Sequence, residues 1–434
     1  MHKYLNKYLG NKSVIFGILA LLAVINGTIF GLNEIPLTGD PVSYNSYATN
    51  LALGNGYHLY DAGFSIYREP AYSFFISVIY RIFGIENFTA VKIVQMFLVA
   101  GIAFFIYLSF EYLNYKNTGL MAAILTSAIP YFGYYTSMMM SEIFFSFFIA
   151  ISFYLLLRIL NKDKRISLYI LLGLTFGIAT LTKSALLLSP LFIAIIIFYF
   201  QKNLYKTLCF LVIFIICIGS WVGYVHKNTG RFSITDGRLD IHIYTRAERA
   251  TLSYKNQIYY LYSWLKRSSL GGIENNILLK YEEKPLIQEY AKRLNNGESA
   301  SEITKENIKT IVRHFDTYIF GSIIEWVKLM FIDHIYPPVP LLLTRAVRAS
   351  FYLIIYSFFL FGSIRFLLYK NIGPKIIFWT SVFYLTYNSV MISLVDAYPR
   401  FNIPYLFFFI VIGATGLSDI FDKKFTQITE KQMQ

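Results

Sequence analysis

The amino-acid sequence predicts an all-α, polytopic membrane protein, on the evidence of its composition and of the lengths of its apolar blocks. Of its 434 residues, 56% are hydrophobic and only 15% are charged, whereas soluble domains carry roughly 25% charged residues. The apolar residues also gather in blocks of about 20, the length that spans a bilayer. These features exclude a soluble multidomain enzyme and a disordered chain. The net charge of +14 is typical of cytoplasmic loops rich in Lys and Arg, and predicts no nucleic-acid partner.

Ten blocks are long enough to cross a membrane as helices. They cover residues 14–32, 90–110, 119–136, 142–158, 167–182, 184–200, 206–225, 346–369, 374–394 and 401–419. An eleventh block, at 71–84, is shorter and contains Arg81. If it lies along the membrane surface, every short cationic loop falls on one side, as the positive-inside rule requires. We therefore expect ten spans, both termini inside, and a juxtamembrane helix at 71–84.

This topology divides the chain into five parts. They are a cytoplasmic N-terminus (1–13), a transmembrane core (14–225) with a catalytic outer loop at 33–89, an extracytoplasmic segment (226–345), C-terminal transmembrane helices (346–420) and a cytoplasmic tail (421–434). The mixed-charge extracytoplasmic segment has a turn signal at 295–297. A run at helical spacing, from Ile303 to Ile319, then leads back toward the membrane.

Ionisable residues interrupt or adjoin the apolar blocks on the predicted outer side. They are Asp40, Arg68, Glu69, Glu142, Lys183, Asp396 and Arg400. A charged group at membrane depth is costly, so it tends to face a cavity and to serve a function. The acids could act as a base, and the cations could hold a phosphate. We therefore expect these residues to converge on one site.

Each of these residues also has a purely structural interpretation. Asp40 suits the N-cap of a helix, and Glu142 suits the first turn of one. Lys183 could snorkel toward the interface. Arg400 could pair with Asp396 four residues earlier, although Pro399 makes a continuous helix there doubtful. For Asp40 the two interpretations are compatible.

Sequence motifs for other chemistries are missing. No cluster has metal-ligand spacing, and no P-loop, nucleophile elbow or nucleotide fingerprint occurs. His314 stands alone, and a single His is more often a packing or surface residue. The segment from Trp221 to Arg238 contains the run NTGRF but no recognisable site. ATP-driven and nucleotide-sugar mechanisms therefore have no support.

The order of these residues resembles that of the membrane-embedded GT-C glycosyltransferases, in the branch of protein O-mannosyltransferases and lipid A aminoarabinose transferases. The resemblance covers roughly positions 14–420, and no single motif carries it. The matching elements are Asp40 with Tyr44, Ala48, Gly54 and Gly56; R-x-P-x-Y at Arg68, Pro70 and Tyr72; Ser-Glu at Glu142; Gly177 with Thr-Lys at Lys183; Trp221 with NTGRF; His314; and R-F-x-x-P at Arg400 and Pro404.

The resemblance implies a polyprenyl-phosphate-linked sugar as donor and an inverting single displacement. It implies catalytic roles for Asp40 and Glu142, and donor-phosphate binding by Lys183, Arg400 and Arg68. It adds substrate-binding candidates, namely Tyr44, Glu69, Tyr72 and His314. Some relatives carry two adjacent acids in the first loop, whereas Pro41 follows Asp40 here. The paired-acid role then belongs to Asp40 alone, or to Asp40 with Glu142 or Glu69.

The acceptor remains open among lipid, glycan and protein, and membrane lipids surround the chain. No cofactor is certain; some relatives use a divalent metal ion. We expect a multi-pass protein of the plasma (inner) membrane, with its site facing outward. A transporter or flippase of lipid-linked saccharides is the main alternative, although it would favour repeated halves and charge within spans. A polysaccharide polymerase or ligase is the second.

Overall fold

The structure, a computed structural model, describes residues 11–31, 37, 39–59, 66–268, 283–331, 342–368, 374–395 and 397–423. Helices are the regular secondary structure throughout these ranges. Most of the predicted N-terminus (1–13) and cytoplasmic tail (421–434) lie outside them, as does Asp396. The expected all-α architecture is confirmed.

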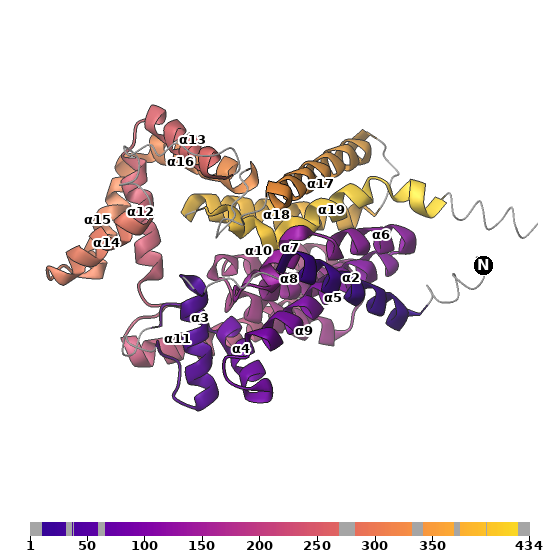
Figure 1. Ribbon diagram of the computed structural model, residues 1–434, viewed down its shortest axis with the longest axis horizontal. Coiled ribbons are helices and arrows are strands. Elements are labelled where there is room, and N and C mark those ends of the chain that lie inside the picture. Colours follow the sequence, from indigo (N-terminus) through magenta and orange to yellow (C-terminus); the bar gives the residue numbers. More distant parts are fainter. Residues whose placement is uncertain are drawn as a thin grey trace, which may run out of the picture.

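The transmembrane helices lie side by side along the long axis of the molecule (Figure 1). Seven helical segments are long and apolar enough to cross a membrane: Lys12–Gly31 (α2), Phe88–Glu111 (α5), Glu142–Leu160 (α8), Ser184–Gln201 (with α10, Ser189–Gln201), Leu204–Thr229 (α11), Ser350–Leu368 (within α17, Leu342–Leu368) and Lys375–Val395 (α18). The buried helix α8 packs against α5, α9 (Ile166–Thr180) and α18 at the centre.

The three other predicted spans are shorter or broken helices. The span at 167–182 is the 15-residue helix α9. The span at 119–136 is two helices, α6 (Lys116–Ser127) and α7 (Pro130–Thr136). Proline has no N–H and disfavours helical backbone before it, and Ile129 is accordingly extended. The Asn26 side-chain amide donates to the carbonyls of Ser127 (2.9 Å) and Ile129 (2.8 Å) at this break.

The last predicted span, 401–419, is also divided. A 3-10 segment, η3 (Pro399–Tyr405), precedes α19 (Leu406–Thr415), whose ten residues are all buried. A short π-helical turn, η4 (Asp419–Lys423), follows. Helices α17 and α19 cross closely, because glycines at positions 362, 413 and 416 let their backbones touch. The total of ten spans therefore stays a prediction.

The predicted juxtamembrane helix at 71–84 is α4 (Pro70–Phe83). It packs against α3 (Asp40–Leu53). One face of α4 buries Tyr72 and Ile76, and the other exposes Phe74 and Val78. An amphipathic helix of this kind suits a membrane surface.

The 226–345 segment folds into helices α12 (Arg238–Ala250), α13 (Tyr254–Ser268), α14 (Glu283–Asn295), α15 (Ala300–Arg313) and α16 (Phe315–Phe331). The predicted turn at 295–297 joins α14 to α15, with Gly297 at a φ of +92°. The helical run from Ile303 to Ile319 is interrupted at His314, where α15 ends. These helices lie at the end of the bundle opposite the start of α2 and the end of the last described helical turn, η4 (Figure 1).

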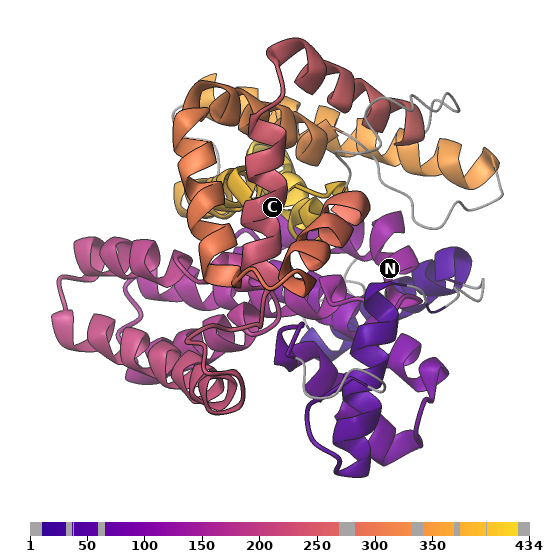
Figure 2. The ribbon, with the colours of Figure 1, turned by 90° about the vertical axis from the view of Figure 1, so that its left-hand side faces the viewer.

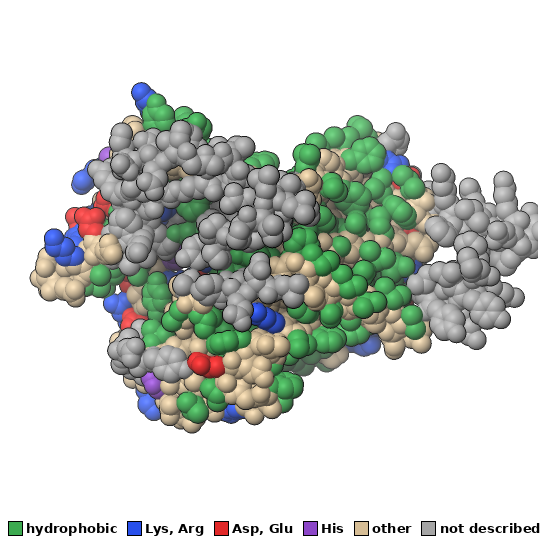
Figure 3. All heavy atoms as spheres, in the orientation of Figure 1, with side chains coloured by type: hydrophobic (Ala, Val, Ile, Leu, Met, Phe, Trp, Pro, Cys, Tyr) green, Lys and Arg blue, Asp and Glu red, His purple; other side chains and the backbone are tan. Residues whose placement is uncertain are grey.

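Seen from that end, α3 and α4 lie on one side of the bundle and α10 and α11 on the other (Figure 2). Hydrophobic side chains cover the bundle around α17 and α19, whereas charged side chains gather near α14 and α15 (Figure 3). This division matches an apolar membrane-spanning part and a polar part outside the bilayer.

Candidate active site

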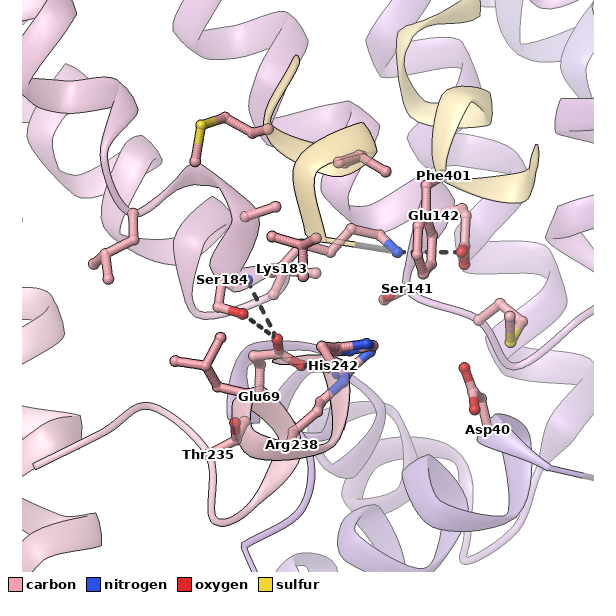
Figure 4. A pocket seen from close by; sticks show the side chains of 18 of the residues that line it. Asp40, Glu69, Ser141, Glu142, Lys183, Ser184, Thr235, Arg238, His242 and Phe401 are labelled. Carbon is pink, nitrogen blue, oxygen red and sulfur yellow. Dashed lines mark hydrogen bonds and ion pairs between the residues drawn. The ribbon is translucent and has the colours of Figure 1, made fainter. Parts of the chain in front are cut away.

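A cavity of about 350 Å³ lies where α3, α4, α8, α10, α12, α18 and η3 meet, and we call it the polar cavity. Its charged and hydroxyl-bearing lining residues include Asp40, Tyr44, Glu69, Ser141, Glu142, Thr182, Lys183, Ser184 and Arg238. They come from the starts of α3, α4, α8 and α12 and from the connection between α9 and α10. Sequence-distant charged residues thus converge, as expected, on one place (Figure 4).

Asp40 is the first residue of α3, and its side chain does not cap the helix. Gly39 is the N-cap, with a φ of +67°, and Pro41 follows in the first turn. The Asp40 carboxylate instead accepts hydrogen bonds from two arginines, Arg68 at Oδ1 and Arg400 at Oδ2, the latter at 2.6 Å. Asp40 therefore joins the first loop, the start of α4 and the segment before α19.

The charge state of Asp40 follows from its two partners. Burial alone would raise the pKa of its carboxyl, but the charges of Arg400 and Arg68 together hold that pKa well below its usual range. The group is therefore ionised at any physiological pH.

Glu69 lies at the N-cap of α4 and connects three elements. Its Oε2 accepts from Arg238 of α12 at 2.6 Å, and its Oε1 accepts from the Ser184 hydroxyl at 2.8 Å. Burial opposes ionisation of Glu69, but Arg238 and the Ser184 hydrogen bonds lower its pKa overall. Glu69 thus fixes Arg238 at the cavity, although Arg238 lies 169 residues away in the chain.

Glu142 is 1% exposed, at the start of α8. Its Oε1 accepts from the Lys183 ammonium at 3.2 Å, whereas its buried Oε2 has no hydrogen-bond partner among the described residues. The Lys183 ammonium also lies 5.0 Å from the centre of the Phe401 ring. A buried acceptor without a partner is uncommon, and this one is available to a substrate hydroxyl.

The opposite side of the polar cavity is apolar. Leu187 and Leu188 precede α10, while Met391, Ile392 and Val395 end α18. Leu187 and Leu188 are both partly exposed at the bundle surface. The cavity is therefore amphipathic, with a charged end and an apolar side between α10 and α18.

Charges at the cavity nearly balance. Four cations, Arg68, Lys183, Arg238 and Arg400, contact three carboxylates, Asp40, Glu69 and Glu142. Arg68 and Arg400 are not among the residues that line the cavity, and they adjoin it through Asp40. Taken as ionised, this set carries a net charge of +1. The arrangement suits an anion with a single charge.

In this structure each of these carboxylates contacts at least one cationic side chain, whereas a divalent metal ion takes several oxygen ligands around one point. Within the described ranges, no group of three His, Cys, Asp or Glu side chains could hold a metal ion.

Tyr44 and Tyr72 differ in their relation to the cavity. Tyr44 lines it and donates to the Ser141 hydroxyl at 3.3 Å, and burial raises its pKa to about 12, so it remains protonated. Tyr72 is not among the lining residues; its hydroxyl bonds Gln95 at 3.1 Å and its ring packs against Tyr44. Tyr72 therefore packs behind Tyr44, outside the lining of the polar cavity.

Two further expectations concern His314 and Arg400. His314 caps the C-terminus of α15, and the polar cavity is lined by other residues. Arg400 pairs with Asp40, while the expected local partner, Asp396, lies outside the described residues. Sequence reasoning did not single out Arg238, His242, Ser184 or Phe401. The only sequence signal for Arg238 was the Asp-Gly turn before it.

Comparisons with known proteins agree with this fold. A family model for dolichyl-phosphate-mannose-protein mannosyltransferases matches residues 68–222. That range contains Arg68, Glu69, Glu142 and Lys183, and the other charged residues of the cavity lie beyond it. Among curated proteins, no sequence matches the chain.

Two solved structures are similar to the chain. The archaeal oligosaccharyltransferase AglB from Archaeoglobus fulgidus, in complex with an inhibitory peptide and a dolichol-phosphate, has a TM-score of 0.52 at 15% identity. The match covers 98% of this chain and 52% of AglB, so the chain spans about half the length of that protein. ArnT from Cupriavidus metallidurans, bound to undecaprenyl phosphate, has a TM-score of 0.43 at 9% identity, over 93% of this chain and 77% of ArnT.

The likeness to AglB shows a shared fold. The chain therefore has the GT-C fold that the sequence resemblance implied, and the family match over residues 68–222 agrees with that resemblance.

Proposed function

We propose that this chain, with its GT-C fold, transfers a sugar from a polyprenyl-phosphate donor to an acceptor hydroxyl at the extracytoplasmic face of the membrane. The observation that carries the proposal is the amphipathic polar cavity, in which Asp40, paired with two arginines, shares the lining with apolar residues before α10 and on α18. The donor combines the same two chemistries, a phosphate and a long hydrocarbon chain.

In this proposal the donor phosphate lies among Lys183, Arg400 and Arg68, with Arg238 as a fourth cation. The prenyl chain leaves between α10 and α18, past Leu188 and Ile392. A polyprenyl-phosphate sugar is a phosphodiester with one negative charge, which balances the net charge of +1 on the four cations and three carboxylates at and beside the cavity. A diphosphate-linked sugar would bring two negative charges.

The reaction is a single displacement at the anomeric carbon. The acceptor oxygen forms the new bond while the bond from the anomeric carbon to the phosphate oxygen breaks and its electron pair stays on the phosphate. The acceptor proton passes to Asp40, and the anomeric configuration inverts. Polyprenyl phosphate leaves as a monoester with more negative charge than the donor, so the surrounding cations stabilise the transition state more than the ground state.

Asp40 acts as base or orients the acceptor hydroxyl, and its ionised state suits both. The pKa of Asp40 is low, so Asp40 accepts the proton only late in the reaction. By then the acceptor oxygen has begun to bond the anomeric carbon, which makes its O–H group acidic. The donor phosphate competes with Asp40 for Arg68 and Arg400, which frees a carboxylate oxygen for the acceptor. The free Oε2 of Glu142 accepts a hydrogen bond from a substrate hydroxyl.

A transporter of lipid-linked saccharides is the alternative. Carboxylates and cations of a transporter would lie along a path through the membrane. Here three carboxylates and two cations line one cavity instead of following a path through the membrane-spanning helices, which favours a reaction site.

Removing Arg400 should weaken donor binding. Hydrogen bonds to charged groups contribute about 1.5–3 kcal/mol, so R400A should raise the Kd for polyprenyl phosphate about 10- to 150-fold. Binding to protein in nanodiscs measures this effect. Arg165 begins α9 at the end remote from Lys183 and pairs with Asp163, so R165A is the matched control. Equal affinities for wild type and R400A would contradict the phosphate role.

The pH profile should respond to the same arginine. Turnover that needs ionised Asp40 is lost as the pH falls through its pKa, which in the wild type lies well below the ordinary value of about 3.9. R400Q removes a lowering charge and leaves burial, which raises the pKa, so the acid limb of kcat/KM should move to higher pH. In the control R165Q the acid limb should stay in place. If it also stays in place in R400Q, Arg400 does not lower the pKa of Asp40.

A further inference from the structure

A second space, which we call the apolar groove, lies beside the polar cavity. It has a volume of about 640 Å³ and lies between α3, α4, α9 and α11. Its lining is Leu51, Gly56, Tyr57, Pro70, Ala71, Phe74, Ile178, Leu181, Ser220, Trp221 and Tyr224. Aromatic rings form one wall, with the Trp221 ring 5.1 Å from Tyr57 and 5.0 Å from Tyr224. No charged side chain is among these residues.

The groove continues onto surfaces suited to lipid. On α11, Val212 and Ile216 are exposed at four-residue spacing before Ser220. On α4, the exposed Phe74 is followed one turn later by the exposed Val78. A hydrocarbon chain can therefore enter the groove from the bilayer without contacting water.

Only a thin wall separates the groove from the polar cavity. Glu69 lines the cavity, and the next residue, Pro70, lines the groove. Ala71 N donates to the Leu181 carbonyl at 3.0 Å, which joins α4 to the end of α9. The Tyr57 hydroxyl donates to the Arg68 carbonyl at 3.0 Å. The apolar groove and the charged residues of the polar cavity are therefore neighbours on the two sides of residues 69–71.

In the proposed function the donor chain has its own path, along the apolar lining of the polar cavity before α10 and on α18. Two separate apolar spaces flank one charged site, which suits a reaction between two lipids. We infer that the acceptor is itself a membrane lipid, with a hydroxyl-bearing headgroup, and that its hydrocarbon chain lies in the apolar groove. This inference rests on the proposed function.

Filling the groove should impair use of such an acceptor. Ser220 projects from α11 with its hydroxyl bonded to the Cys217 carbonyl of its own helix, so S220F fills the groove without removing a long-range contact. I215F, at a position exposed on another face of the same helix, is the matched control. The probe is a glycosylated diacylglycerol with a diazirine in one acyl chain, reconstituted in phosphatidylglycerol nanodiscs.

Photo-cross-links to wild type and I215F should concentrate in residues 217–224. In S220F they should fall at least tenfold, which corresponds to about 1.4 kcal/mol. F74A removes an aromatic ring that lines the groove and should also lower cross-linking. This second variant tests the inference even if S220F does not fold. Cross-links spread evenly over residues 208–224 and unchanged in both groove variants would overturn the inference.

Measurements of enzymatic turnover distinguish a failure of this inference from a failure of the proposed function. With a polyprenyl-phosphate sugar donor, the KM of wild type for the glycosylated diacylglycerol should be at least tenfold below that of S220F, while KM for the donor stays unchanged. If wild type releases polyprenyl phosphate but its labelled sugar appears only on water-soluble glycans or peptides, the lipid-acceptor inference fails and the glycosyltransferase proposal stands. If no sugar donor is cleaved, the proposed function fails, and cross-linking alone still reports whether a lipid occupies the groove.

Discussion

D40N should lose turnover by about 10²–10⁴-fold, the usual contribution of a positioned general base. The substitution keeps the size of the side chain and removes its charge and proton affinity. Arg68 and Arg400 then lose their anionic partner but remain available to phosphate. We therefore expect the Kd for polyprenyl phosphate to hold or to fall, while kcat collapses. Release of polyprenyl phosphate and equilibrium binding, measured on the same preparation, separate the two effects.

The chain contains a matched control for this variant. Asp163 is also paired with two arginines, Arg158 and Arg165, at 2.6 Å each, and it lies before α9, away from the polar cavity. D163N therefore tests what losing an Asp between two arginines does to folding. Full transferase activity in a folded D40N protein would contradict the assignment of Asp40.

The α17–α19 crossing should fail on addition of a single methyl group. A Cβ at Gly416 would lie 1.9 Å from the Gly362 carbonyl oxygen, and a Cβ at Gly362 would lie 2.3 Å from the Gly413 oxygen. Both clashes involve backbone, which cannot rotate away as a side chain can. Overpacking costs about 1–3 kcal/mol and occasionally more, so G416A should lower the unfolding midpoint clearly in a denaturant titration in detergent.

G223A provides the comparison for that variant. Gly223 lies in α11, and a Cβ there would meet nothing within 4 Å. Alanine in a helix is more stable than glycine by roughly 0.5–1 kcal/mol, so G223A should match or exceed the wild type. Equal midpoints for G416A and G223A would show that the two backbones do not approach this closely.

The helical architecture could be predicted because apolar block length and charge bias act locally. Two of the predicted spans are divided into shorter helical segments, and both divisions occur at prolines. Pro130 breaks one predicted span, and Asn26 stabilises the break from a helix a hundred residues earlier. Pro404 lies within the 3-10 segment that precedes α19. The residues on both sides of Pro130 and Pro404 are apolar, so the hydropathy of the sequence does not reveal these two breaks.

The charged residues of the site could be identified from the sequence, but their partners could not. Asp40, Glu142 and Lys183 stood out because charge beside an apolar block is costly. The pairing of Asp40 with Arg400 joins residues 360 positions apart, and no local pattern encodes it. Arg238 was missed because it begins a polar helix in which charge is ordinary, and only the fold brings it to Glu69.

The central claim is that the polar cavity cleaves a polyprenyl-monophosphate sugar. Its most direct test is release of polyprenyl phosphate from a panel of radiolabelled monophosphate- and diphosphate-linked sugars, by wild type and D40N in liposomes. We predict release by wild type alone, and from a monophosphate-linked donor. Movement of intact labelled lipid across the liposome membrane by both proteins, with no donor cleaved, would contradict the account and identify a transporter.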